Sequence, residues 1–299
     1  MIFFFLKKKI FFVISFFSSF KHMKYKKKPI KKYKKNQNIR KENNFAMISD
    51  PVEITYPTIT VMKLFINGQY VDSISGRTFD TINPTTEEKI ISVSDAQPED
   101  IDLAVKSARK AFDSGPWHRF SASQRGKLLL NLAALLEKHS EEFAQLESMD
   151  NGTPRTVARA FVKMAIETFR YNGGYADKVH GQAIPIEGPY LCYTRHEPVV
   201  AAVFPWNASM VMVAWKMGPA LAMGCTMVIK PAEQTPLTAL KLGELLNEAG
   251  FPPGVVNIVS GFGLTAGKPL VQHALVDNVA FTGSTEVGLE IIRGSHVSN

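Results

Sequence analysis

Apolar positions in the first half of the chain recur with the spacing of helices that bury one face. From about Pro98 to Phe112, apolar side chains return every three or four residues, which matches the 3.6-residue period of an α-helix. The same spacing predicts further helices over residues 121–139, 141–149 and 154–179. We therefore expect helices to dominate this half of the chain.

Short strands precede these helices. Residues 63–66 and 69–71 are separated by Asn67 and Gly68, and an Asn-Gly pair readily supplies the two positive φ angles of a type I′ turn. The pattern predicts a β-hairpin.

A second hairpin is predicted over residues 181–198, where apolar residues lie on both sides of Gly188 and Pro189. If it projects from the body of the protein, its apolar side chains need a partner surface. We therefore expect this hairpin to contact another subunit of a homo-oligomer.

The second half of the chain alternates short apolar runs with helical segments. The runs cover residues 199–204, 226–229, 255–259 and 279–281. Parallel strands need such long crossover connections and are buried on both faces. This alternation predicts an α/β fold with a doubly wound parallel sheet. Ligands of such sheets bind beyond the carboxyl ends of the strands.

The basic charge of the chain is concentrated in one segment. Residues 1–46 contain 14 of the 35 Lys and Arg residues and one of the 27 Asp and Glu residues, so the remainder is mildly acidic. The net charge of +8 is therefore no indication of nucleic-acid binding by the folded part.

Three interpretations of this basic tail remain open: an over-extended start before Met47, a targeting peptide, and an arm that binds a membrane surface or polyanion. Its apolar stretch, residues 10–20, is shorter than the 20 or so residues that cross a bilayer. We expect no membrane span and a cytoplasmic location, with the mitochondrial matrix as the alternative.

Cysteine and histidine usage argues against disulfide and metal chemistry. Cys192 and Cys225 are the only cysteines, which is too few for a disulfide framework. The seven histidines form no zinc-binding spacing. We expect a reducing compartment and no metal site.

The turns after the four predicted strands have a distinctive composition. They read Phe204-Pro205-Trp206-Asn207, Lys230-Pro231-Ala232-Glu233, Gly261-Phe262-Gly263 and Thr282-Gly283-Ser284-Thr285-Glu286-Val287-Gly288. In this order and spacing they resemble those of the aldehyde dehydrogenase superfamily, most closely its NAD-linked cytosolic, mitochondrial and retinal-oxidising branch. The similarity extends from about Ile54 to the end of the chain. The resemblance implies a Rossmann-like sheet, NAD as cofactor and an aldehyde as substrate.

Two of these turns contain glycines suited to a dinucleotide. Gly283 permits a sharp turn, after which Ser284 and the following amides can meet a pyrophosphate at a helix N-terminus. The resemblance assigns the phosphate site to this turn, which continues to Gly288. Gly263 belongs to a generic dinucleotide fingerprint with Gly261, but the family places this turn beside the adenine. We therefore predict a cofactor contact there without the pyrophosphate.

Lys230 and Glu233 follow the second strand at a spacing that lets both side chains reach one ribose. A carboxylate accepts hydrogen bonds from free ribose hydroxyls and repels a 2′-phosphate, so the pair favours NAD over NADP. A Lys-x-x-Glu pair elsewhere would be read as a surface ion pair. The remaining residues of these turns, Phe204, Pro205, Trp206, Asn207, Pro231 and Ala232, complete the predicted cofactor contacts.

Asn207 is the predicted catalytic residue. Family members attack the aldehyde with a cysteine thiolate, and the resulting oxyanion needs donors such as an Asn amide. The family usually follows this Asn with an aromatic residue and Pro, whereas this chain has Ala208 and Ser209. Loss of a helix-initiating Pro removes one constraint on the position of the amide.

The family's nucleophilic cysteine and general-base glutamate lie downstream of the segment that matches this chain. We therefore expect a basic tail (1–46), the N-terminal strands and helices of the cofactor domain (47–180), an oligomerisation hairpin (181–198), a Rossmann-like NAD-binding core (199–299) and no catalytic domain. The sheet should lack its fifth strand, which would leave one edge unpaired. Either the chain represents an incompletely recorded aldehyde dehydrogenase or it is a non-catalytic fragment that binds nucleotide or sibling subunits.

Overall fold

The computed structural model describes Ile59 and residues 63–179 and 199–294, together with the backbone of four further short strands. Those strands are β1 (Ile2–Leu6), β2 (Lys9–Ile14), β7 (Ala183–Ile184) and β8 (Cys192–Tyr193).

Four parallel strands form the centre of the structure, in the spatial order β12, β9, β10, β11. The prediction of a doubly wound parallel sheet is confirmed, with strand ends within about two residues of those expected. The strands are β9 (Val199–Val203), β10 (Thr226–Lys230), β11 (Val256–Ile258) and β12 (Asn278–Thr282).

Both faces of this sheet are covered. In β9, Val199 and Ala201 belong to one buried cluster, while Val200 and Ala202 belong to the other. Successive side chains of a strand point to opposite faces, so an uninterrupted apolar run is what a doubly covered strand requires. The apolar runs therefore correctly indicated parallel strands.

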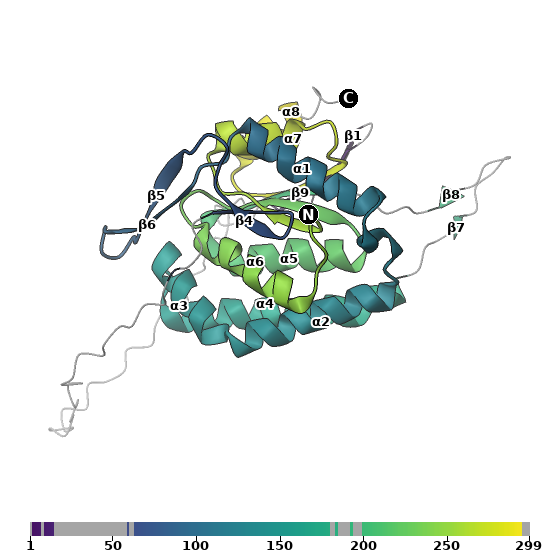
Figure 1. Ribbon diagram of the computed structural model, residues 1–299, viewed down its shortest axis with the longest axis horizontal. Coiled ribbons are helices and arrows are strands. Elements are labelled where there is room, and N and C mark those ends of the chain that lie inside the picture. The colour runs from purple at the N-terminus through teal and green to yellow at the C-terminus, as the bar shows by residue number, and fades with distance from the viewer. Residues whose placement is uncertain are drawn as a thin grey trace, which may run out of the picture.

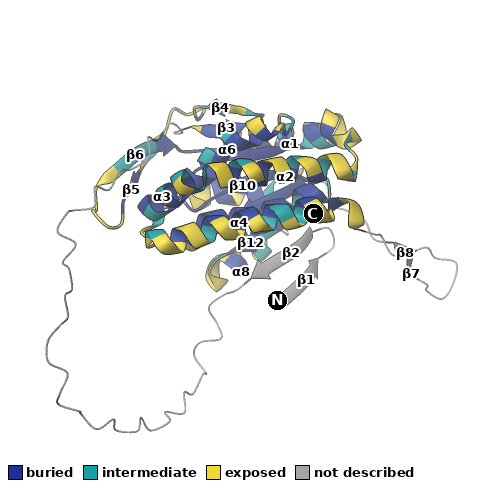
Figure 2. Cartoon of the chain, turned by 90° about the horizontal axis from the view of Figure 1, so that it is seen from below, coloured by how far each residue is buried: buried dark blue, intermediate teal, exposed yellow. Residues whose placement is uncertain are grey.

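Helices pack in layers on the two faces of the sheet (Figures 1 and 2). One face is covered by α1 (Pro98–Asp113), α7 (Lys268–Gln272) and α8 (Thr285–Gly294). The other face is covered by α5 (Ser209–Ala222) and α6 (Leu237–Ala249), which are covered in turn by α2 (Ala122–Lys138), α3 (Ser140–Asn151) and α4 (Arg155–Tyr175).

Local capping explains where the outer helices begin and end. The Gln124 amide donates to Ser121 Oγ over 3.2 Å, and Gln124 Oε1 accepts from the Ser121 amide over 2.8 Å, so a capping box starts α2. The helix α3 ends at Gly152, whose φ of 73° suits a residue without a Cβ.

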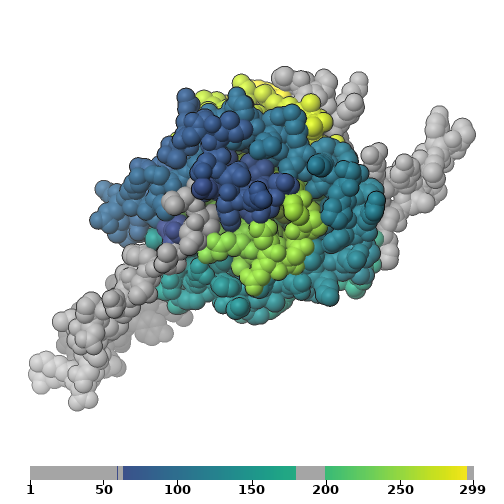
Figure 3. All heavy atoms as spheres, in the orientation of Figure 1, coloured from purple at the N-terminus to yellow at the C-terminus, as the bar shows by residue number. Residues whose placement is uncertain are grey.

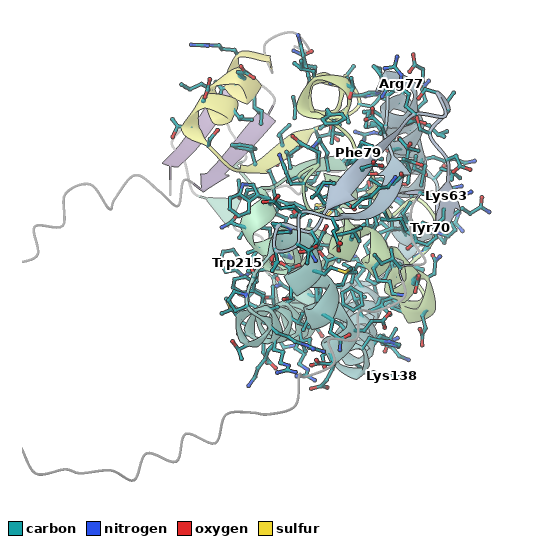
Figure 4. All side chains as sticks on the ribbon, turned by 90° about the vertical axis from the view of Figure 1, so that its left-hand side faces the viewer. Lys63, Tyr70, Arg77, Phe79, Lys138 and Trp215 are labelled. Carbon is teal, nitrogen blue, oxygen red and sulfur yellow. The ribbon has the colours of Figure 1, made fainter. Side chains whose placement is uncertain are left out.

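The predicted N-terminal hairpin consists of β3 (Leu64–Ile66) and β4 (Gln69–Val71), with φ of 54° at Asn67 and 75° at Gly68. The strand β3 pairs antiparallel with β11 and so widens the sheet. The Tyr70 hydroxyl donates to the Leu240 carbonyl over 2.7 Å, and Figure 3 shows this part of the chain seated against residues near 250. In Figure 4, Tyr70 and Trp215 lie on opposite sides of the molecule.

A further hairpin, β5 (Thr78–Ile82) with β6 (Lys89–Ser94), was not predicted. It leads into a segment beside β11, where the Ala96 amide donates to the Ser260 carbonyl over 2.8 Å.

The opposite edge of the sheet differs from the expectation. The backbone of β2 runs parallel to β12, with Phe11 beside Val279 and Ile14 beside Thr282, and β1 pairs antiparallel with β2. The expectation that β12 would be an unpaired edge was therefore wrong. Strand pairing satisfies amides and carbonyls that would otherwise be exposed at this edge. The other features expected of residues 1–46 lie outside the described residues.

Within the described residues, no helix is both long and apolar enough to cross a membrane. Of the hairpin expected over residues 181–198, the structure describes only the antiparallel pair of β7 and β8.

The backbones of α2 and α4 approach closely at two glycines. A Cβ added to Gly126 would lie 2.5 Å from the Gly173 carbonyl oxygen, a distance that requires the helices to separate. We expect Gly126→Ala to lower the free energy of unfolding by about 1–3 kcal/mol, measured by urea denaturation. The neighbouring exposed Gly174, whose added Cβ meets nothing within 4 Å, is the control. Gly174→Ala should be neutral or stabilising by up to ~1 kcal/mol; equal losses from the two substitutions would contradict the close-approach argument.

Candidate functional site

The direction in which the chain adds strands to the sheet reverses between β9 and β12, which makes their boundary a topological switch point. The chain leaves β9 toward β10 and β11 on one side, and later returns to place β12 on the other. Val203 lies beside Phe281 in the ladder, so the two strands end at the same level. Loops that diverge at such a point leave a crevice in which ligands of doubly wound sheets bind.

The loop after β9 forms one wall of this crevice. Phe204 is buried, whereas Trp206 and Asn207 in the short 3₁₀ turn η4 (Trp206–Ala208) are exposed. The helix α5 follows directly at Ser209. The missing Pro therefore does not prevent the helix from starting immediately after Asn207.

The loop after β12 forms the facing wall. A Cβ on Gly283 would lie 2.5 Å from Phe281 Cζ, so the glycine lets this ring fold over the turn. Ser284 Oγ accepts from the Val287 amide over 3.3 Å, and the Ser284 carbonyl accepts from the Gly288 amide over 3.0 Å. Ser284 therefore caps α8, whose first turn is exposed to solvent.

Lys230 and Glu233 lie at the end of the neighbouring strand β10. Lys230 is 3% exposed and its Nζ lies 2.9 Å from the Pro231 carbonyl and 3.4 Å from Glu233 Oε2. Burial lowers the pKa of Lys230, and the carboxylate of Glu233 opposes that effect. Pro231 and Ala232 are buried between them. The two side chains therefore lie within ion-pair distance of each other; that both reach one ribose stays a prediction.

Gly263 follows β11, one strand further from the crevice, and begins the short π-helical turn η5 (Gly263–Gly267). A Cβ added to Gly263 would meet nothing within 4 Å, and Leu264 beside it is 79% exposed. The adjacent Phe262 ring lies 5.1 Å from the ring of Phe79 on β5. Open space at Gly263 leaves room for a ligand, although no packing contact requires a glycine.

Lys216 is a site residue that the sequence did not reveal. Its Nζ donates to Thr282 Oγ1 over 2.9 Å, which joins α5 to the end of β12 beside the switch point of the sheet. Burial lowers its pKa to about 8. The residue interrupts an apolar helix face, but only the position of β12 shows what the ammonium meets.

Two buried carboxyl groups at the end of α3 were also missed. Glu147 and Asp150 are 1% and 2% exposed. Glu147 Oε1 accepts from Asn151 Nδ2 over 3.1 Å, and the nearby amides of Met210 and Ser209 at the start of α5 oppose the rise that burial causes in its pKa. The Leu237 amide donates to Asp150 Oδ2 over 2.9 Å. The two acids therefore lie at the positive N-terminal ends of α5 and α6.

Cys225 lies away from this crevice. It is buried immediately before β10, at the amino end of the strand, whereas the predicted site residues follow the carboxyl ends. In the part of the chain that the structure describes, no cluster of three or more His, Cys, Asp or Glu side chains could hold a metal ion.

Comparison with known proteins agrees with this arrangement. Residues 70–298 match the family model "Aldehyde dehydrogenase family". The chain belongs to the aldehyde dehydrogenase family.

Relatives from several organisms cover the same part of the chain. It is 53% identical over 245 residues to the mitochondrial aldehyde dehydrogenase family 2 member B4 of Arabidopsis thaliana (80% of this chain, 46% of the relative). It is 51% identical over 255 residues to cytosolic aldehyde dehydrogenase 1 of Macroscelides proboscideus (83% and 50%). The NAD⁺ complex of a Bacillus cereus aldehyde dehydrogenase superposes with a TM-score of 0.76 at 53% identity, covering 80% of this chain and 49% of that protein. The chain thus spans about half the length of these aldehyde dehydrogenases.

The buried acids make stability depend on pH. Burial raises the pKa of Glu147 to about 7 and raises that of Asp150, whose rise the charge of Glu147 reinforces. A carboxyl whose pKa is raised by folding stabilises the folded state at pH values below its ordinary pKa. For Glu147 this contribution is lost as the pH rises through about 7. We expect the free energy of unfolding to fall by about 3 kcal/mol between pH 5 and pH 8.5 because Glu147 ionises over this range. In urea denaturation at several pH values, Glu147→Gln should reduce this dependence of stability on pH.

Glu141 is the control for this titration. Hydrogen bonds from Arg159 lower its pKa to about 2, so its contribution is lost only as pH falls toward that value. Glu141→Gln should leave the slope between pH 5 and 8.5 unchanged. A slope that Glu147→Gln leaves unchanged would show that the Glu147 carboxyl does not titrate in this range.

Proposed function

We propose that this chain forms the NAD-binding part of an enzyme that oxidises an aldehyde to a carboxylic acid. The observation that supports this most strongly is the meeting of the β9 and β12 loops at the switch point of the sheet, with the Lys230–Glu233 pair on the next strand. Relatives named as aldehyde dehydrogenases, and one solved with NAD⁺, share about half of their residues with this chain over the matched region.

The residues present fit a dinucleotide. The exposed first turn of α8, after Gly283 and Ser284, offers backbone amides and a positive helix end to a pyrophosphate. Gly288 lies on the buried side of the same helix. The open space at Gly263 suits the adenine end. The loop of Phe204, Pro205 and Trp206 completes the proposed binding surface.

Lys230 and Glu233 would hold the adenosine ribose. The ammonium is held in place by the Pro231 carbonyl, so it can donate to a hydroxyl without losing its own partner. The carboxylate, at 31% side-chain exposure, can accept from the free 2′-hydroxyl and would repel a 2′-phosphate. This arrangement favours NAD over NADP.

Asn207 would act on the aldehyde. When bound, NAD supplies the acceptor for the hydride that leaves the substrate carbon. The Asn207 side chain is exposed at the crevice, where its amide can donate to an oxyanion as negative charge develops. The buried Lys216 ammonium fixes the end of β12 through Thr282, which keeps the facing wall in place.

Subunit contacts and location follow the same reasoning. We propose that the β7–β8 hairpin contacts a second copy of the chain in a homo-oligomer. A cytoplasmic location is proposed, with the mitochondrial matrix as the alternative; the relatives include enzymes named cytosolic and mitochondrial. The proposed partners are an aldehyde and sibling subunits, without nucleic acid or a membrane span.

The ribose argument predicts cofactor preference. In calorimetric titrations the 299-residue chain should bind NAD⁺ more tightly than NADP⁺, and Glu233→Gln should narrow the ratio of the two dissociation constants on the order of tenfold, or ~1.4 kcal/mol. Glu248→Gln removes the same charge from an exposed position at the end of α6 and should leave the ratio unchanged. Equal affinities in the unsubstituted chain would refute the assignment of Glu233.

The same proposal predicts that residues 1–299 alone oxidise no aldehyde. Hydride transfer requires a thiolate adduct, and Cys225 is buried at the wrong end of β10. Absorbance at 340 nm with NAD⁺ and a short aliphatic aldehyde should stay constant. NADH formation that persists after both Cys192 and Cys225 are replaced by Ala would show that the mechanism assigned here is wrong.

A further inference from the structure

Two of the strand-end loops are joined by one buried side chain. Thr235, two residues after Glu233, donates from its hydroxyl to the Trp206 carbonyl over 3.3 Å. Trp206 immediately precedes Asn207. The ribose loop after β10 is therefore in direct contact with the Asn207 turn after β9, through a residue that is only 2% exposed.

Ser209, on the other side of the Asn207 turn, also contacts Thr235. Its Oγ lies 3.0 Å from Thr235 Oγ1 and 3.2 Å from the Thr235 carbonyl, so the Ser209 hydroxyl can donate to either oxygen. Trp206 and Ser209 flank Asn207 on both sides. Both are thus held by the same threonine.

Glu147 lies behind the same turn. The backbone amides of Ser209 and Met210 lie close enough to its carboxyl to oppose the rise that burial causes in its pKa, and α3 packs against both η4 and α6. Its neighbour Asp150 accepts from the Leu237 amide, two residues after Thr235. Two acids on α3 therefore lie beside the two loops that Thr235 joins.

We propose that Ser209 and Thr235, with Glu147 buried behind them, form a polar lock that positions the Asn207 amide relative to the Lys230–Glu233 ribose site. The inference rests on the proposed function, in which these two loops contact the substrate and the cofactor respectively. The three residues are positioning residues, since they are buried and act through the backbone on either side of Asn207.

The chemistry of the lock explains why three polar groups are buried here. A buried hydroxyl or carboxyl without a partner is costly, so each member stabilises only the geometry in which the others are in reach. An apolar contact would tolerate sliding of one loop over the other, because dispersion has little directionality. Directional hydrogen bonds specify one relative position of the two loops.

Two substitutions of Thr235 separate the effect of its hydroxyl from the effect of its shape. Thr235→Val preserves shape and removes the hydroxyl, whereas Thr235→Ser preserves the hydroxyl. In hydrogen–deuterium exchange of the full chain, Thr235→Val should speed exchange of backbone amides in residues 206–210 at least tenfold, and Thr235→Ser should restore protection to within about threefold of the unsubstituted chain. In calorimetric titration, Thr235→Val should weaken NAD⁺ binding severalfold more than Thr235→Ser.

Ser209→Ala tests the hydroxyl of the lock. It removes the bond to Thr235 and keeps the backbone amide at the start of α5. We expect Ser209→Ala to speed exchange of the Trp206 and Asn207 amides severalfold, because the turn then keeps only the bond from Thr235 to the Trp206 carbonyl. Unchanged exchange in Ser209→Ala would show that this hydroxyl takes no part in the lock.

The outcomes separate the lock from the proposed function. Exchange in residues 206–210 is read without any ligand, so unchanged exchange in Thr235→Val overturns the lock even when NAD⁺ binds. Exchange in α2, which lies outside the lock, reports general unfolding; equal acceleration there and in residues 206–210 would also overturn it. Selective acceleration in a chain that shows no NAD⁺ affinity supports the lock and contradicts the proposed cofactor instead.

Discussion

Strand β9 is paired on both sides by parallel neighbours, and this pairing determines where a ligand can bind. Its backbone groups are occupied by β10 and β12, and its side chains are buried on both faces of the sheet. The carboxyl end of β9 lies beside that of β12, and the chain continues from these two strands to opposite sides of the sheet. The crevice is thus a consequence of strand order, and the side chains around it are adaptations to that position.

Periodicity predicted most of this fold because burial imposes it. Strands covered on both faces need continuous apolar runs, and helices covered on one face need a 3.6-residue repeat. The residues 199–204 and 98–112 show these two patterns. The β5–β6 hairpin escaped prediction because its strands mix buried, partly buried and exposed residues and follow neither pattern. The pairing of β2 with β12 escaped because it joins segments more than 260 residues apart.

The candidate site was predictable only as far as it lies in the strand-end turns. Lys230 with Glu233 and Gly283 with Ser284 are each local in sequence, so their spacing was enough to suggest that they act together. Lys216 with Thr282 depends instead on the tertiary fold, which brings α5 beside the end of β12. Buried charges of this kind are rare in helices unless they have a partner, and the sequence does not show which partner that is.

Ser209 stands where the family usually has a proline, and tertiary contacts replace the local constraint that the proline would supply. A proline after the asparagine turn would begin α5 through its restricted φ, without an amide or a hydroxyl. Serine lacks that restriction, so the start of the helix must be specified by other means. Here its hydroxyl contacts Thr235 over 3.0 Å, and its backbone amide lies beside the buried Glu147, so two residues on different elements surround it. The turn that presents Asn207 is therefore specified by α3 and by the ribose loop, and a change in either would be transmitted to the position of its amide.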